Sequence, residues 1–153
     1  MQKIKRALIS VSDKEELKQV LQVLNKYQVE IISTGGTFKE IRKLKFNCKE
    51  ISEYTKMPEI LDGRVKTLHP KIYAGILNNR KKKIHKKELV NHNFKNIDLV
   101  IINFYPFEKI LESSKDHKNI IENIDIGGPT IVRAAAKNYN DVTVITSKNQ
   151  YKE

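Results

Sequence analysis

Residues 98–103, with the sequence DLVIIN, decide the predicted fold. Residues 99–102 are all apolar, so both faces of a strand formed by this segment would be apolar. Such an unbroken run is typical of a strand in a parallel sheet whose two faces are both covered by helices. The stretch therefore predicts a buried strand inside an α/β domain.

Strand-like and helical segments alternate along the rest of the chain. Short segments of strand length are found at 7–11, 29–33 and 142–146, and residues 49–52 are expected to form a brief strand. Helices are expected within 17–24, 38–44, 71–95, 120–124 and 127–136. Strands that alternate with helices imply right-handed crossovers. We therefore expect an α/β fold with three layers, in which helices cover both faces of a mostly parallel sheet.

Local motifs predict where two helices begin, and they also predict one long loop. Ser12 and Glu15 have the S-x-x-E spacing of a capping box. Pro129 is expected at a first helical position, where its missing amide would be unpaired anyway. Residues 53–70 contain Pro58, Gly63 and Pro70 and are predicted to form a long ordered loop. Loops of this length are uncommon and are often functional.

Composition excludes several classes of protein. The chain has 153 residues and a formal net charge of +11, which suits one domain over residues 1–153. No apolar stretch approaches the ~20 residues that span a bilayer, and the apolar run after Arg6 is too short for a signal peptide. The single cysteine, Cys48, provides neither a disulfide nor a zinc motif. We expect a cytoplasmic protein without a membrane partner or a bound metal.

The positive charge is weak evidence for a nucleic-acid partner. Lysine accounts for most of the 29 cations, and tryptophan is absent. The densest cationic run, RKKKIHKKE at 80–88, is expected to be a solvated helix face or loop. No nucleic-acid recognition motif accompanies the run, so no nucleic-acid partner is expected.

Polar segments follow the predicted strands where a parallel sheet binds ligands. Ligands of open parallel sheets lie beyond the carboxyl ends of the strands, and the segments near those ends are 10–14, 33–37, 103–107 and 125–130. The first two precede predicted helices, whose free amides attract anions, although plain helix capping is an alternative. Neither has P-loop or GxGxxG spacing, which favours a mononucleotide or sugar phosphate over ATP or NAD.

The loop DGRVKTLHP at 62–70 carries the most chemical information. Arg64 and Lys66 alternate as in an extended segment, which would direct both cations to one side. Tyr105, Asp125 and Lys137 have simpler alternative roles as a core residue, a helix cap and a charge at a helix C-terminus. The residues alone therefore indicate a phosphate-binding α/β enzyme with lysine, tyrosine and aspartate as candidate proton carriers.

Five segments together resemble the inosine monophosphate cyclohydrolase domain family, which has a methylglyoxal-synthase-like fold. They are SVSDK (10–14), STGGT (33–37), DGRVKTLHP (62–70), NFYPF (103–107) and IDIGGPTIVRAAAKN (124–138). The resemblance covers residues 4–151. Glu15-Glu16, Phe104 and Tyr73-Ala74 depart from the family pattern. Family members continue beyond this domain into a transformylase domain, so the resemblance implies a C-terminally short cyclohydrolase domain and no formyl transfer.

The resemblance implies a hydrolase-class ring closure at the end of de novo purine biosynthesis. The substrate would be 5-formamidoimidazole-4-carboxamide ribotide, and the products inosine monophosphate and water, with no cofactor. Lys66 would stabilise an oxyanion, while Lys137, Tyr105 and Asp125 would carry protons. The implied substrate-binding residues are Ser12, Asp13, Lys14, Thr34, Gly35, Gly36, Thr37, Arg64, Val65, Thr67, Ile102, Asn103 and Ile126.

Other functions remain open on the sequence alone. Methylglyoxal synthase shares the fold and binds phosphate, but lacks the DGRVKTLHP and RAAAKN segments. A regulatory domain of the same fold could keep the phosphate turns, but would not need Lys66, Tyr105, Asp125 and Lys137 together. The resemblance also implies a homodimer, and a formyltransferase domain that is either separate or missing.

Overall fold

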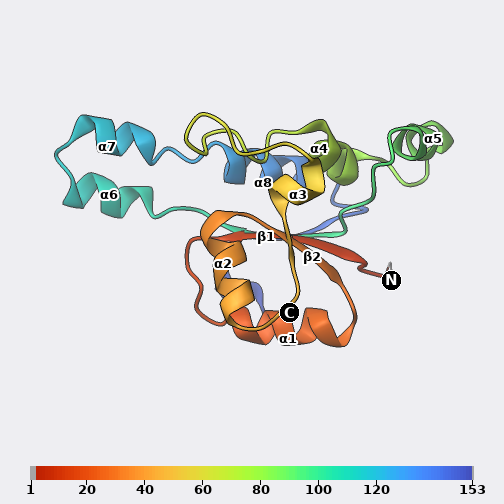
Figure 1. Ribbon diagram of the computed structural model, residues 1–153, viewed down its shortest axis with the longest axis horizontal. Coiled ribbons are helices and arrows are strands. Elements are labelled where there is room, and N and C mark those ends of the chain that lie inside the picture. The colour runs from red at the N-terminus through yellow and green to blue at the C-terminus, as the bar shows by residue number, and fades with distance from the viewer. Residues whose placement is uncertain (1–2, 153) are drawn as a thin grey trace.

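The computed structural model describes residues 3–152 and is built around a five-stranded sheet (Figure 1). The strands lie in the order β3-β2-β1-β4-β5, and all four neighbouring pairs are parallel. Their bounds are β1 Arg6–Val11, β2 Glu30–Ser33, β3 Lys49–Glu50, β4 Leu99–Asn103 and β5 Thr143–Ile145. The predicted parallel α/β fold is confirmed.

Two helical layers cover the sheet, as predicted. Helices α1 (Leu17–Lys26) and α2 (Gly35–Lys43) lie on one face, and α4 (Pro70–Leu77) and α8 (Gly127–Lys137) lie on the other (Figure 1). Alternate residues of β1 enter the two cores: Ala7 and Ile9 pack with the α1 side, and Leu8 packs with the α4 and α8 side. Because both faces of the strands are buried, their apolar runs are unbroken.

The remaining helices lie at the periphery. Helices α6 (Phe107–Ser113) and α7 (His117–Glu122) form a projection at one end of the molecule, which we call the α6–α7 arm, and neither contains a buried residue (Figure 1). Helix α5 (Lys83–Asn91) lies at the other end. The 11-residue α8 is the longest helix between residues 3 and 152. No helix in that range is long and apolar enough to cross a membrane.

The predicted strand at 49–52 and loop at 53–70 are partly wrong. The strand ends at Glu50, and helix α3 (Ile51–Thr55) begins at the next residue. Ile51 and Tyr54 of this helix are buried in the core on the α4 side of the sheet. The burial of these side chains against the sheet favours a helical turn that the local pattern did not indicate. The loop itself therefore spans residues 56–69.

Helices α1 and α8 begin where expected, at Leu17 and Gly127, but the motifs predicted at their starts are wrong. Helix α1 begins at Leu17, and Glu16 before it has a left-handed backbone with no side-chain cap, so the capping box at Ser12 does not form. The Ser12 hydroxyl instead lies 2.9 Å from Asn103 Oδ1 and 2.7 Å from the carbonyl oxygen of Phe104. Pro129 is the third residue of α8, which begins at Gly127. Tertiary hydrogen bonds to the end of β4 have replaced the local cap.

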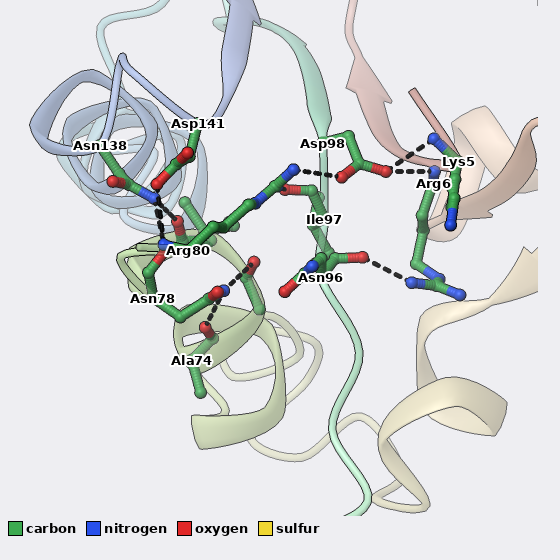
Figure 2. Close-up of polar contacts among 12 residues, drawn as sticks. Lys5, Arg6, Ala74, Asn78, Arg80, Asn96, Ile97, Asp98, Asn138 and Asp141 are labelled. Atoms are coloured by element: carbon green, nitrogen blue, oxygen red, sulfur yellow. Dashed lines mark hydrogen bonds and ion pairs between the residues drawn. The ribbon is translucent and has the colours of Figure 1, made fainter. Parts of the chain in front are cut away.

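A buried carboxylate joins three segments at the edge of the sheet where β1 and β4 begin. Asp98 Oδ2 accepts hydrogen bonds from the backbone amides of Lys5 at 2.7 Å and Arg6 at 2.8 Å. Asp98 Oδ1 lies 2.8 Å from Arg80 Nη1, and the two side chains are only 7% and 9% exposed (Figure 2). The expectation that the 80–88 run is wholly solvated is therefore wrong at Arg80.

A second ion pair lies at the same edge of the sheet. The Arg6 guanidinium donates through Nε to Glu30 Oε2 at 2.7 Å, and Lys49 Nζ lies 3.6 Å from Glu30 Oε1. Burial alone would raise the pKa of Glu30, but the hydrogen bond and charge of Arg6, with the charge of Lys49, outweigh it and lower that pKa. Ionised Glu30 is therefore more favourable in the folded chain than in the unfolded chain.

We predict that Asp98→Ala lowers the free energy of unfolding by about 3–5 kcal/mol, because it leaves the buried Arg80 charge unpaired. Urea denaturation followed by circular dichroism would measure the change. Glu40→Ala is the matched control, because it removes the exposed Glu40–Lys43 pair and should have little effect. A similar loss in both variants would contradict the prediction.

We predict that Glu30→Gln destabilises the chain at neutral pH but not in acid. Because the pKa of Glu30 is lowered on folding, its contribution is fully present above the unfolded value of 4.5 and is lost as pH falls through the folded value. Urea denaturation of both proteins across the acid range would show the stability difference shrinking. A difference that stays constant from neutral pH to strong acid would refute this assignment.

Candidate active site

A cavity of about 510 Å³ opens where β1, β2 and β4 end. Its volume lies in the range of small-molecule sites. The predicted substrate turns, the 62–67 part of the loop and the segment between α7 and α8 all contribute to its wall. The predicted site residues that line it are Ser12, Lys14, Thr34, Gly35, Gly36, Thr37, Arg64, Lys66, Thr67, Ile102, Asn103, Tyr105, Asp125 and Ile126.

Two helix N-termini meet at the cavity. At the start of α2, Thr34 makes no side-chain cap, and Gly35 adopts a left-handed backbone with φ +46°. A Cβ built on Gly35 would lie 3.9 Å from Lys66 Nζ, so the Lys66 ammonium is beside this helix start. Uncapped amides and a neighbouring cation together favour an anion.

The start of α8 is held by Asp125. Its Oδ1 accepts a hydrogen bond from the amide of Gly128 at 2.9 Å, so the alternative of Asp125 as a helix cap is correct. A Cβ built on Gly127 would lie 2.6 Å from Thr67 Oγ1, and one on Gly128 would collide with the Asp125 carboxylate. The two glycines therefore allow the 56–69 loop and Asp125 to approach α8 closely.

Two predicted ligand groups are already engaged with the protein backbone. Thr37 Oγ1 accepts from the Val11 amide at 2.9 Å and donates to the Val11 carbonyl at 3.0 Å. Asn103 Oδ1 accepts from the Ser12 amide at 2.6 Å, and its Nδ2 donates to the Asp13 carbonyl at 3.0 Å. Their side chains shape the turns around the cavity, and their roles as ligand groups stay predictions.

Arg64 crosses from the loop to the α6–α7 arm. Its guanidinium donates through Nε to Glu122 Oε1 at 3.1 Å and through Nη2 to Glu122 Oε2. The hydrogen bond and charge of Glu122 raise the pKa of Arg64, and those of Arg64 lower the pKa of Glu122. Lys66 faces another acid more loosely, with its Nζ 4.0 Å from Glu59 Oε2. Both predicted cations of the loop thus lie near carboxylates.

Three predicted site residues do not line the cavity. Asp13 turns to Lys148, whose Nζ lies 3.0 Å from its Oδ2, and the Glu15 amide and Lys148 lower the pKa of Asp13. Val65 pairs instead with Ile60 in an isolated bridge. Lys137 is the exposed last residue of α8, about 15 Å along the helix from the end at the cavity. The structure does not bring Lys137 to the other candidate catalytic residues, and its catalytic role stays a prediction.

The individually predicted residues leave out part of the cavity wall, although Ser10, Asp62, Gly63, Gly127 and Gly128 belong to segments that the sequence predicts near the ligand. The additional lining residues are Ser10, Val11, Asp62, Gly63, Ile121, Glu122, Asn123, Ile124, Gly127, Gly128 and Ile131. The apolar spacing predicts Ile121 and Ile124 as helix residues, and Ile124 also begins the IDIGGPTIVRAAAKN segment, whereas both side chains are 46% exposed. The available signal was their closeness in sequence to Asp125.

The cavity wall carries apolar, cationic and hydroxyl groups but no cluster suited to a metal. Tyr105 is 57% exposed and lines the cavity. Within residues 3–152, no three or more His, Cys, Asp or Glu side chains gather as metal ligands would. The arrangement can bind an anion at the helix starts and place Lys66, Tyr105 and Asp125 around the ligand.

We predict that Gly128→Ala lowers the thermal unfolding midpoint, because the new methyl group displaces the Asp125 carboxylate and its cap. Gly36→Ala is the matched control, because a Cβ there meets nothing within 4 Å and alanine favours a helix over glycine. Differential scanning calorimetry would compare the two variants. An equal midpoint for Gly128→Ala and the parent chain would contradict the proposed role of the cap.

Comparisons with known proteins agree with this architecture. A family model described as MGS-like domain matches residues 16–130. The bifunctional purine biosynthesis protein PurH of Clostridioides difficile is 50% identical over 147 residues, which are 96% of this chain and 29% of that protein. PurH of Acetivibrio thermocellus is 53% identical over 149 residues, with shares of 97% and 29%. This chain therefore spans less than a third of the length of these relatives.

A solved structure shares the fold of this chain. The structure described as "Crystal structure of ForH" matches with a TM-score of 0.85 and 28% identity, over 98% of this chain and 77% of that one. The family model covers well over half of the chain, including the cavity residues from the start of α2 to the start of α8. The chain therefore belongs to the MGS-like domain family.

Proposed function

We propose that this chain is an inosine monophosphate cyclohydrolase. It would close the ring of 5-formamidoimidazole-4-carboxamide ribotide and release water. The observation that carries the proposal is one cavity with Lys66, Tyr105 and Asp125 in its wall beside two helix N-termini. The identity of about half to proteins named as bifunctional purine biosynthesis proteins supports the same reaction.

The phosphate of the ribotide would bind at the start of α2. Gly35 and Gly36 provide backbone amides that no side chain caps, and Lys14 lines the same cavity with positive charge. Helix amides and cations are the usual protein partners of a phosphate group. The base would then extend toward the 62–67 part of the loop and the start of α8.

Ring closure joins two groups of one molecule. The carboxamide nitrogen attacks the formyl carbon, a C–N bond forms, and the nitrogen loses a proton while the formyl oxygen gains negative charge. The C–O bond then breaks as a ring nitrogen loses a second proton and a C=N bond forms, and the oxygen leaves as water after taking up both protons. Because both reacting groups belong to the ribotide, the protein mainly has to orient them and move protons.

The three cavity residues suit these steps. Lys66 would stabilise the oxyanion, because a fixed cation beside the developing charge lowers the barrier. Tyr105 and Asp125 would carry the protons, with Asp125 held in place by its hydrogen bond to the Gly128 amide. The role of Lys137 as the leading acid or base rests on the family resemblance alone. The proposals of a cytoplasmic homodimer, and of a formyltransferase domain that is either separate or missing, have the same basis.

We predict that the chain forms inosine monophosphate from the formamido ribotide. The change in ultraviolet absorbance would measure this reaction. Lys66→Ala should lower kcat about 100- to 1,000-fold, as loss of an oxyanion-stabilising group does, with a smaller change in KM. Lys87→Ala is the matched control, because Lys87 lies on α5 away from the cavity. Formation of methylglyoxal from dihydroxyacetone phosphate, without inosine monophosphate, would overturn the proposed function.

The same assay tests Lys137. If Lys137 carries a proton, Lys137→Ala should lower kcat with little change in KM. Normal turnover in that variant would remove Lys137 from the mechanism and leave proton transfer to Tyr105 and Asp125.

A further inference from the structure

The ion pair between Arg64 and Glu122 joins two parts of the cavity wall. Arg64 belongs to the 56–69 loop, Glu122 is the last residue of α7, and both line the cavity. The side chains are 63% and 52% exposed, so the pair lies in contact with solvent. Exposed ion pairs add little to stability unless their geometry is good, and the two-pronged contact of this pair also fixes the direction of a side chain at the cavity.

The hydrogen bonds use only one edge of the guanidinium. Glu122 accepts from Nε and Nη2 in a two-pronged contact. Between residues 3 and 152, Nη1 makes no hydrogen bond, so the edge formed by Nη1 and the second Nη2 hydrogen stays available. A guanidinium has five donors in a rigid plane, so fixing one edge also fixes the direction of the other.

We propose that Glu122 is a positioning residue that holds Arg64 in one orientation for the substrate. The free edge of Arg64 would then donate to an oxygen of the ribotide. This inference rests on the proposed function, because it takes that nucleotide as the ligand. Without Glu122, an exposed arginine would populate many rotamers, and binding would have to order it.

Charge alone would produce the opposite effect. Glu122 places a negative charge beside a cavity that would receive an anion, so its removal would strengthen binding if only the electrostatic field mattered. Positioning predicts weaker binding on removal. The direction of the change in affinity therefore distinguishes the two roles.

The test is the neutral, similarly shaped variant Glu122→Gln. Its KM for the formamido ribotide and its Kd for inosine monophosphate, measured by calorimetry, should rise about two- to ten-fold, the effect of leaving one long side chain to be ordered on binding. Its kcat should stay within about two-fold, because Glu122 does not touch the reacting atoms in this proposal. The control is Glu112→Gln, an exposed acid of the same arm that does not line the cavity.

A double-mutant cycle shows whether Glu122 acts through Arg64. In an Arg64→Ala background, Glu122→Gln should have no further effect on Kd, because the group it positions is gone. An equal weakening in both backgrounds, or tighter binding by Glu122→Gln, would overturn the inference. A lower thermal midpoint that accounts for the weaker binding would also overturn it, because Glu122 would then only support the arm. Failure of the parent chain to bind inosine monophosphate would overturn the proposed function and this inference with it.

Discussion

The buried carboxylate of Asp98 is the contact on which the rest of the architecture depends. It accepts from the amides of Lys5 and Arg6 at the start of β1 and pairs with Arg80 beyond α4. A charge this deep in the protein needs all of these partners, so they hold β1 and β4 in one register. That register ends with Val11 opposite Asn103. A slip of one residue would turn every side chain of the strand to the other face.

This register also positions the cavity, which lies at the opposite end of the sheet, where the strands end. Because Val11 and Asn103 end together, the Asn103 amide reaches the Ser12 turn, and Thr37 reaches the backbone of Val11. These side chains fix the turn after β1 and the start of α2, and Asp125 fixes the start of α8. These side chains hold the backbone around the cavity in place. The groups that we propose bind the ligand are different ones: the free helix amides, Lys66, Tyr105 and the open edge of Arg64.

Predictions from local patterns succeeded where several side chains of one segment are buried. The runs at 7–11 and 98–103 predicted strands, which lie side by side in the structure, and the parallel sheet with helices on both faces is confirmed. Predictions failed where one distant partner decides the outcome. Ser12 has its hydrogen-bond partner Asn103 91 residues away, and Arg80 was expected in a solvated run because Asp98 is not its neighbour in sequence.

Local sequence patterns predict the layers, the alternation of strands and helices, and most of the segments around the cavity, because hydrophobic periodicity and glycine-rich turns are local properties. The partners of the polar side chains are set when distant segments come together in the folded chain. The tertiary structure engaged Asn103 and Thr37 with backbone, turned Asp13 to Lys148, joined Arg64 to Glu122 and left Lys137 at the far end of α8. The partners of a side chain belong to segments that are close in space but far apart in the sequence. The spacing of residues along the chain therefore does not predict them.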